Sequence, residues 1–180
     1  AFMVPEGEGC HLRWMTPGGE IDLCGHATLA AAFVQMNFVE PGRQELVFRT
    51  LSGLRKVRRQ GERYEMEFPA YELRQVPVTE EMVQAIGLRP LEAWMGRDRV
   101  CVLEGEEQVR RAQPDLERVK TLDGLLLHLT ASGSAYTCVS RSFAPKLSVP
   151  EDPVCGSGHC HIAPLWADKL GLCELTARQA

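Results

Sequence analysis

The stretch EDPVCGSGHCHI, residues 151–162, is matched in the first half of the chain by DLCGHATLAAA, residues 22–32. In each stretch an aspartate stands two or three residues before a cysteine, and a glycine follows the cysteine directly. In each, the glycine leads into a largely apolar run that is typical of a buried helix. The match predicts a weak internal repeat, in which both halves place strands, a Cys-Gly element and a helix in the same order.

The helices predicted after these two elements have little polar surface. Residues 26–38, HATLAAAFVQMNF, are apolar on every side until Pro41-Gly42 ends the run, so we expect this helix to be buried all round. Residues 157–171, SGHCHIAPLWADKLG, predict a second such helix that is entered from glycine and ends at Gly171. Pro164 should kink this second helix or delay its start.

Strand patterns surround the first helix. Residues 12–16 and 46–68 are mostly strand-like, because β-branched and aromatic residues alternate with polar ones. The clearest alternation is YEMEF, residues 64–68, which predicts a half-buried antiparallel strand entered from the turn at Gln60-Gly61. A hairpin through residues 51–53 is expected to precede it.

The second half is expected to follow a linker within residues 69–78, where two prolines interrupt the strand pattern. Thr79 is predicted to cap a helix that ends at Gly87. Short helices are also predicted at residues 106–112 and 115–122, and strands at 99–105, 124–131 and 135–145. The chain is therefore predicted to form two domains, residues 1–74 and 75–180.

A cysteine beside the N-terminus of a buried helix can act as an acid or a base. The helix dipole and the N–H groups of the first turn lower the pKa of a thiol, so we expect Cys24 and Cys155 to form thiolate near neutral pH. The same N–H groups bind a carboxylate, and the glycine after each cysteine allows a ligand to approach the backbone. Two such thiols on opposite faces of one carbon would catalyse two-base racemisation, or a proton-shift isomerisation.

Other interpretations of these residues stay open. A free cysteine is more often a small buried apolar side chain than a catalyst, and we expect that role for Cys10, Cys101, Cys138, Cys160 and Cys173. His26 is either an acid/base group or a buried histidine with its hydrogen bonds satisfied, and Asp152 either caps its element or titrates. Zinc is not favoured, because residues 155–161 lack the second ligand pair that closed sites use. We expect neither a metal nor an organic cofactor.

Composition argues against several classes of protein. The formal net charge of the 180 residues is −4, and the basic run at residues 54–63 is followed by acidic residues, so a nucleic-acid partner is not expected. No apolar run approaches the roughly 18 residues that cross a bilayer, so a membrane partner is not expected either. Seven cysteines, an odd number without the spacing of a disulfide scaffold, favour a reduced, cytoplasmic protein.

Three stretches resemble the phenazine-biosynthesis-like (PhzF-type) isomerase family, which shares its fold with diaminopimelate epimerase and proline racemase. They are LRWMTPGGEIDLCGHATLAAA (12–32), CVSRSFAP (138–145), and EDPVCGSGHC with the PLWADKLG that follows it (151–160 and 164–171). The resemblance implies an α/β (α+β) fold of two similar domains, each a barrel-like, mostly antiparallel sheet around one central apolar helix. It also implies an active site in the cleft between the domains.

The resemblance also implies which residues form the site. The acid/base groups would be Cys24, His26, Asp152 and Cys155, and the substrate would be bound by Gly25, Ala27, Gly156, Ser157 and Gly158. Phenazine-type relatives use a glutamate that would lie just ahead of Ala1, and closing strands are expected after residue 180. The position of Cys155 is commonly threonine in the family.

The leading hypothesis is an isomerase or epimerase that moves a proton on a small carboxylate-bearing substrate, with a homodimer as the expected assembly. A non-catalytic binding or scaffold protein of the same fold is the alternative from a different class. A cysteine hydrolase built on Cys155 and His159 is a third, although the sequence shows no orienting acid for it.

Overall fold

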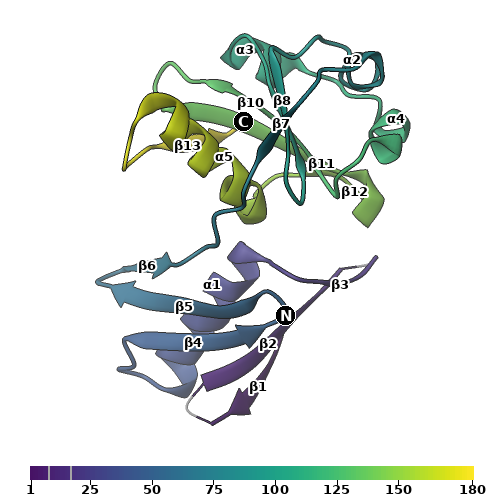
Figure 1. Ribbon diagram of the computed structural model, residues 1–180. Coiled ribbons are helices and arrows are strands. Elements are labelled where there is room, and N and C mark those ends of the chain that lie inside the picture. Colours follow the sequence, from purple (N-terminus) through teal and green to yellow (C-terminus); the bar gives the residue numbers. More distant parts are fainter. Residues whose placement is uncertain (8, 17) are drawn as a thin grey trace. The chain divides into compact units, whose positions relative to one another are not determined.

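The computed structural model describes residues 1–7, 9–16 and 18–180, so Pro17 of the 12–32 stretch lies outside the described residues (Figure 1). The chain divides into two compact units, Ala1–Pro69 and Ala70–Ala180. This division falls inside the predicted linker, and strand β7 (Arg74–Val76), which that linker also contains, is part of the second unit. Among the described residues, no helix has both the length and the apolar character needed to span a bilayer.

The first unit contains one sheet, with strands in the order β1-β2-β4-β5-β6 and β3 paired to β2. The strands are β1 (Phe2–Glu6), β2 (Gly9–Thr16), β3 (Gly19–Ile21), β4 (Glu45–Thr50), β5 (Gly53–Gln60) and β6 (Arg63–Met66). The hairpins predicted at residues 51–53 and 60–61 are confirmed, and Gly53 and Gly61 supply the positive φ values of 97° and 62° that these turns require.

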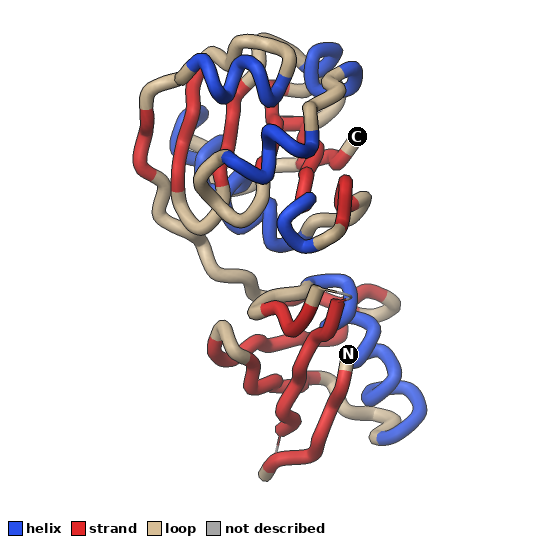
Figure 2. The backbone as a smooth tube through the Cα atoms, turned by 90° about the vertical axis from the view of Figure 1, so that its right-hand side faces the viewer, coloured by secondary structure: helices blue, strands red, loops and turns tan. Residues whose placement is uncertain are grey.

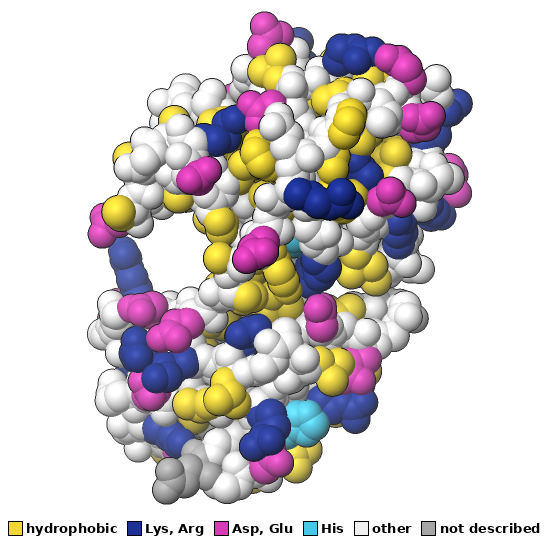
Figure 3. Space-filling model, viewed as in Figure 1, with side chains coloured by type: hydrophobic (Ala, Val, Ile, Leu, Met, Phe, Trp, Pro, Cys, Tyr) yellow, Lys and Arg dark blue, Asp and Glu magenta, His cyan; other side chains and the backbone are white. Residues whose placement is uncertain are grey.

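Charged side chains lie on strands β4 and β5 of this sheet. Arg58 on β5 pairs with Glu45 on β4 at 2.8 Å and with Glu67 at 3.3 Å. Figure 3 shows basic and acidic side chains interleaved over this part of the first unit rather than gathered by sign.

Helix α1 (Gly25–Val34) continues as a π-helical turn over Gln35–Val39 and lies against one face of the sheet (Figures 1 and 2). Ala32 and Met36 are buried there with Leu12, Trp14 and Phe48. The predicted position of this helix is confirmed, but its predicted burial on every side is wrong. Phe38 and Val39, in the π-helical turn, are 72% and 59% exposed, because the sheet covers the helix from one side only.

The second unit contains a sheet with strands in the order β12-β11-β10-β9-β8-β7, and β13 pairs with β11. Its remaining strands are β8 (Glu92–Met95), β9 (Arg99–Val102), β10 (Leu127–Ser132), β11 (Cys138–Ala144), β12 (Val149–Asp152) and β13 (Ala177–Gln179). Both faces of this sheet are covered, so β9 is buried along its whole length. Cys101 faces one core cluster, while its neighbours Val100 and Val102 face another.

Three short helices cover the first of these faces: α2 (Glu80–Ile86), α3 (Glu106–Arg111) and α4 (Leu116–Thr121). The predicted cap of α2 is confirmed, since the Thr79 hydroxyl accepts the N–H of Met82 and Gly87 ends the helix in the left-handed conformation. At α4, the Asp115 carboxylate accepts the N–H groups of Glu117 and Arg118.

Helix α5 (Gly156–Leu170) covers the opposite face. It contains Pro164, which does not delay its start, since the helix begins at Gly156. A proline has no N–H, so the carbonyl of Cys160 is left without its usual helical donor. That carbonyl accepts the N–H of Tyr71 at 2.9 Å, which ties the residues before β7 to α5.

The internal repeat has a structural counterpart. In the first unit, β2 pairs antiparallel with β3, α1 follows, and β4 returns parallel to β2. In the second unit, β11 pairs antiparallel with β12, α5 follows, and β13 returns parallel to β11. Each Cys-Gly element therefore lies where a short hairpin passes into the helix of the same strand-strand-helix-strand arrangement.

Candidate functional site

The first Cys-Gly element places a thiol and an imidazole side by side at the start of α1. Cys24 is the N-cap residue in an extended conformation, and its Sγ lies 3.6 Å from Nε2 of His26. The Cys24 side chain is half-buried, and His26 is exposed. The first N–H that bonds within the helix pattern is that of Thr28, which donates to the Cys24 carbonyl at 3.2 Å. The N–H groups of residues 25–27 thus lie at the positive end of the helix, beside this thiol and imidazole pair.

Gly25 and Ala27 fix how this helix start packs in the first unit. A Cβ on Gly25 would lie 2.6 Å from Cζ of Phe68, so the glycine makes room for the end of that ring. The Ala27 side chain packs toward the core cluster of the sheet. These two predicted substrate-binding residues would therefore meet a ligand through their backbone rather than through side chains.

The second Cys-Gly element has the opposite environment. Cys155 is the N-cap residue of α5 and is only 2% exposed, packed against Leu126 and Ala144. Its Sγ lies 3.5 Å from the Ser157 hydroxyl.

The expected lowering of the thiol pKa is wrong for Cys155. Burial raises the pKa of this thiol to about 11, and the charge of Asp152 acts in the same direction. The hydrogen bonds that favour the thiolate do not compensate for the loss of water around it. At neutral pH, Cys155 is a protonated thiol.

Asp152 holds the turn that leads into α5. Its Oδ1 accepts the N–H of Val154 at 3.0 Å, and its backbone carbonyl accepts the side-chain amide of Gln179. The Gln179 side chain in turn accepts the N–H of Cys155 at 2.7 Å. Asp152 is also the cross-strand partner of Ser142. Of the two roles left open for this carboxylate, the structure displays the capping one.

The residues after this element pack within the unit. His159 Nδ1 lies 3.1 Å from the Cys155 carbonyl, and burial lowers the pKa of its imidazole. Cys160 is buried, with its thiol directed at the Gly156 carbonyl. His161 is fully buried and stacks on the Tyr71 ring at 4.6 Å between centroids. Gly156 and Ser157 remain half-buried at the helix start.

A buried polar network lies behind Cys155. Nε2 of His128 is 3.1 Å from Oδ2 of Asp98, and Nδ1 of the same ring is 2.9 Å from the Ser142 hydroxyl. Asp98 and His128 are fully buried, and Ser142 is 1% exposed. Burial acts to raise the pKa of the Asp98 carboxyl, but the hydrogen bonds from His128 and Arg97 outweigh it and hold that pKa well below its ordinary range.

His161 joins this network from α5. The backbone N–H of Asp98 donates to Nε2 of His161 at 3.2 Å, so the proton of the neutral ring sits on Nδ1. Nδ1 faces the Ser157 carbonyl at 3.3 Å and Oδ2 of Asp98 at 3.7 Å. Burial lowers the pKa of His161 to about 4, although the Asp98 charge acts against this.

Asp98, His128 and His161 have the ligand types and the spacing for a metal ion. The guanidinium of Arg97, however, lies 2.8 Å from the same Asp98 oxygen that the two histidines approach. A metal there would place a second cation beside the arginine, and it would have to displace the N–H donor from His161. The donor set therefore fits a hydrogen-bonded network better than a metal centre.

Sequence reasoning missed this network, although a signal was present. In LLLHLTA and CVSRSFA, His128 and Thr130 are two positions apart, as are Ser140 and Ser142. His128 and Thr130 therefore share one face of the sheet, and Ser140 and Ser142 share it with them. That face is the one covered by α5, where Thr130 accepts the indole N–H of Trp166 at 3.0 Å. This spacing of two between polar residues in buried strands was the observation that could have located the network.

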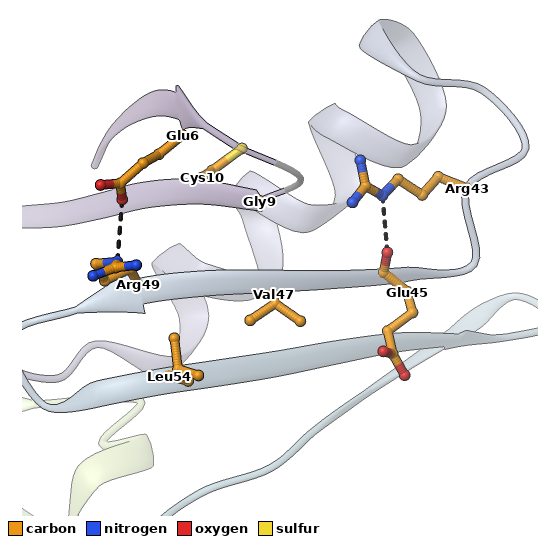
Figure 4. Close-up of a pocket in the computed structure, with 8 residues that line it drawn as sticks. All are labelled: Glu6, Gly9, Cys10, Arg43, Glu45, Val47, Arg49 and Leu54. Carbon is orange, nitrogen blue, oxygen red and sulfur yellow. Dashed lines mark hydrogen bonds and ion pairs between the residues drawn. The ribbon is translucent and has the colours of Figure 1, made fainter.

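A depression of about 380 Å³ lies on the first unit, away from the predicted residues (Figure 4). Its charged lining is paired, with Glu6 on Arg49 at 3.2 Å and the Arg43 guanidinium on the Glu45 carbonyl at 3.0 Å. It contains none of the acid/base or substrate-binding residues predicted from the sequence.

Comparison with known proteins gives the family. The profile of the PhzC-PhzF family, phenazine biosynthesis-like protein, matches residues 1–180. The chain belongs to this family. An uncharacterized isomerase of Pseudomonas aeruginosa is 45% identical over 181 residues, a match that covers 99% of this chain and 69% of the relative.

Solved structures agree with this assignment. The crystal structure of a PhzF family protein from Enterococcus faecalis superposes with a TM-score of 0.90 at 44% identity, over 98% of this chain and 68% of the other. A predicted epimerase from Pseudomonas aeruginosa superposes with a TM-score of 0.64 at 18% identity, over 95% and 66% of the two chains, which shows the fold alone. The PhzF-like fold is thus a mixed α+β fold with two sheets, as predicted.

Proposed function

We propose that this PhzF-like chain is an isomerase that moves a proton on a small carboxylate-bearing substrate, without a metal or organic cofactor. The assignment to the isomerase class rests on family membership and on curated relatives that are named isomerases. The type of substrate and the proton transfer are inferred from the two helix starts.

The observation that carries the proposal is the 3.6 Å contact between the Cys24 thiol and the His26 imidazole at the start of α1. His26 can take the thiol proton, and the thiolate that forms lies at the positive end of the helix. The thiolate then removes a proton from the carbon next to the substrate carboxylate, and a proton returned to that carbon or to another completes the isomerisation. The N–H groups of Gly25, His26 and Ala27 would bind the carboxylate.

Cys155 is suited to donating a proton to the substrate rather than removing one. Its raised pKa keeps the thiol protonated at neutral pH, so it can give a proton but is a poor base at rest. When the proton leaves, the Ser157 hydroxyl and the Gly158 N–H stabilise the thiolate. The same burial makes Cys155 a poor nucleophile, which weighs against the cysteine hydrolase alternative.

Deuterium wash-in tests the proposal. The protein is incubated in D2O with a panel of amino acids and hydroxy acids, and proton NMR follows the signal of the carbon beside each carboxylate. We expect exchange in at least one of them, and a loss of about 100-fold in Cys24→Ser and in His26→Asn, since a positioned acid/base group contributes about that much. Cys173→Ser, which changes an exposed thiol in the second unit, is the matched control and should exchange at the wild-type rate.

Two outcomes would contradict the proposal in different ways. Full-rate exchange in Cys24→Ser would show that the thiol and imidazole pair is not the base. Binding of a carboxylate without any exchange across the panel would instead favour the non-catalytic binding protein.

A further inference from the structure

We propose that Gln179 positions the Cys155 thiol, because its side-chain amide ties the turn that carries this cysteine to strand β13. Gln179 acts through Cys155, so it is a positioning residue rather than a catalytic one. The value of this tie for proton transfer rests on the proposed function, whereas the tie itself is a property of the folded second unit.

The turn before α5 is fixed in shape by its own residues. It runs from Asp152 to Cys155, and Pro153 occupies its second position, where the fixed φ of proline suits a β-turn. Oδ1 of Asp152 accepts the N–H of Val154 at 3.0 Å, which is the hydrogen bond of an Asx-turn. These local contacts decide the course of the chain within the turn, but they do not decide where the turn lies against the sheet.

The sheet itself holds this turn weakly. Strand β12, which leads into the turn, pairs with β11 at Ser142↔Asp152 and Ala144↔Val149, and the register shifts between these two pairs. One side of the turn faces solvent, since Val154 is 59% exposed. An irregular pairing and an open side would let the turn move away from the sheet if no further contact held it.

Gln179 supplies that further contact from β13. Its side-chain N–H donates to the Asp152 carbonyl, and its side-chain carbonyl accepts the N–H of Cys155 at 2.7 Å. A β-turn brings its first carbonyl and its last N–H to the same side, so one planar amide bonds to both. Arg141 also holds β12, through Glu151 at 2.7 and 2.8 Å, but its grip ends at the residue before the turn.

The position of the turn decides the surroundings of the thiol. Cys155 is the last residue of the turn and the N-cap of α5, and it is 2% exposed against Leu126 and Ala144. An outward shift of the turn would take its Sγ out of this packing and into water. An acid/base group must also be held closely in place to meet a substrate carbon, so the tie that fixes the turn fixes this group as well.

The corresponding residue of the first unit makes a different contact. Thr50 is the last residue of β4, which returns parallel to β2 after α1, just as Gln179 is the last residue of β13. The Thr50 hydroxyl donates to the Gly53 carbonyl at 2.6 Å, within the hairpin that follows β4. The arrangement common to both units therefore does not require an amide that reaches the Cys-Gly element, and the tie is specific to the second one.

The first test compares Gln179→Leu with the matched control Arg178→Leu. Adjacent residues of a strand point to opposite faces, and the Arg178 guanidinium lies over the Tyr136 ring at 5.7 Å from its centroid. Iodoacetamide labelling, read by peptide mass spectrometry, gives the rate at each cysteine. We expect Cys155 to react at least about tenfold faster in Gln179→Leu, because the turn loses two hydrogen bonds, and at the wild-type rate in Arg178→Leu.

Two other buried cysteines separate a displaced turn from a general loss of stability. Cys101 on β9 and Cys138 on β11 are fully buried in the same unit. Cys138 pairs with Ala177, so it also reports any loss of β13. Both should keep their wild-type rates in Gln179→Leu. An unchanged rate at Cys155, an equal rise at Cys101 or Cys138, or an equal rise in Arg178→Leu would each overturn the proposal.

A second measurement uses the unmodified chain. A long-range HNCO spectrum detects couplings across hydrogen bonds, and it should correlate the N–H of Cys155 with the side-chain carbonyl carbon of Gln179. The backbone hydrogen bonds between β10 and β11 are the reference in the same spectrum. A missing correlation where the reference bonds are seen would overturn the proposal, so the outcome is decided even if Gln179→Leu does not fold.

Turnover relates the tie to the proposed function. With a substrate that deuterium wash-in identifies, Gln179→Leu should lower kcat about tenfold and leave KM within about twofold, because the thiol is displaced while the N–H groups of residues 156–158 stay on the helix. A rise in KM at unchanged kcat would overturn the positioning role. Labelling and NMR use no substrate, so the tie can hold in a chain that exchanges no substrate proton, and it can fail while wash-in through Cys24 succeeds.

Discussion

The two Cys-Gly elements are alike in sequence and in their place in the fold, yet their thiols have different environments. The Cys24 thiol is half-buried beside an exposed imidazole, whereas the Cys155 thiol is 2% exposed, is packed against Leu126 and Ala144, and lies 3.5 Å from the Ser157 hydroxyl. Each lies at the positive end of a helix, so the helix dipole alone does not decide the protonation of a thiol. Solvent and the nearest titratable group decide it.

The two elements also differ in which part of the fold supplies an imidazole. In the first unit the imidazole beside the thiol comes from the helix itself, two residues further on. In the second unit a buried imidazole comes from the sheet, where His128 on β10 bonds to the Ser142 hydroxyl on β11. The buried Asp98 carboxylate bonds to His128 and holds its ring in place.

The largest effect should come from removing this Asp98 carboxylate. Asp98→Ala leaves the Nε2–H of His128 and the N–H of Leu126 without their acceptor, and Arg97 without its ion-pair partner. We expect the free energy of unfolding of the second unit to fall by about 3 to 5 kcal/mol. Urea unfolding followed by peptide-resolved hydrogen exchange measures this for each unit separately.

Asp123→Asn is the control for that change. The Asp123 carboxylate is 93% exposed and lies 3.8 Å from Arg99, so its loss should leave stability unchanged. A loss in Asp98→Ala no greater than in this control would show that the buried network does not support the second unit.

The second-largest effect should be a loss of stability of the second unit in acid. Burial lowers the pKa of His161 to about 4, while an unfolded histidine titrates near pH 6.5, so the unfolded chain binds the extra proton first as the pH falls. The stability that neutral His161 contributes is therefore complete above about pH 6.5 and is lost progressively toward pH 4. The loss amounts to about 3 kcal/mol.

Hydrogen exchange between neutral and mildly acid pH checks this expectation. The second unit should lose protection in the wild-type chain and lose less in His161→Gln, whose amide can still accept the Asp98 N–H. The first unit serves as the internal control in each sample. Equal acid sensitivity in the wild-type chain and the variant would assign the effect to other groups.

Thiol reactivity compares the two elements directly. A thiol with a pKa of about 11 has a thiolate fraction about 100-fold smaller at neutral pH than an ordinary thiol, and burial slows its reaction further. We expect iodoacetamide to label Cys155 at least about 100-fold more slowly than the exposed Cys173, and Cys24 at least as fast as Cys173. Peptide mass spectrometry of one reaction gives all three rates, and equal rates at Cys24 and Cys155 would remove the contrast between the elements.

Local sequence rules predicted the elements but not the environments of their side chains. The Thr79 cap, the glycine turns at 53 and 61 and the starts of both long helices follow from residues close together in the chain. Burial does not. The apolar run at residues 26–38 predicted a helix covered on every side, but a single sheet face covers it, and Phe38 stays exposed.

The same limit explains the Cys155 pKa and the missed network. The dipole of α5 was visible in the sequence, whereas the packing of Leu126 and Ala144 on the thiol depends on strands that meet only in the folded unit. Asp98, His128 and Ser142 are far apart in the chain, and each alone is an ordinary polar residue. The available signal was the spacing of two between His128 and Thr130 in β10 and between Ser140 and Ser142 in β11, since a polar residue repeated on a buried sheet face requires a partner.

The smallest effect should be the difference in stability loss between alanine substitutions at the glycines of the two elements. In Gly158→Ala the new Cβ would meet the His128 ring at 2.9 Å, and this ring is fully buried and held by Asp98. We expect a loss of about 1 to 3 kcal/mol in the second unit, because an overpacked core cannot move the ring without breaking its hydrogen bonds. In Gly25→Ala the new Cβ would meet the far end of Phe68, which is 39% exposed and can turn aside, and would be in ordinary contact with the end of Met66. The loss should therefore stay below about 1 kcal/mol. The same urea and hydrogen-exchange measurement ranks the two variants, and a larger loss in Gly25→Ala would mean that the first helix start, not the second, is the more tightly constrained.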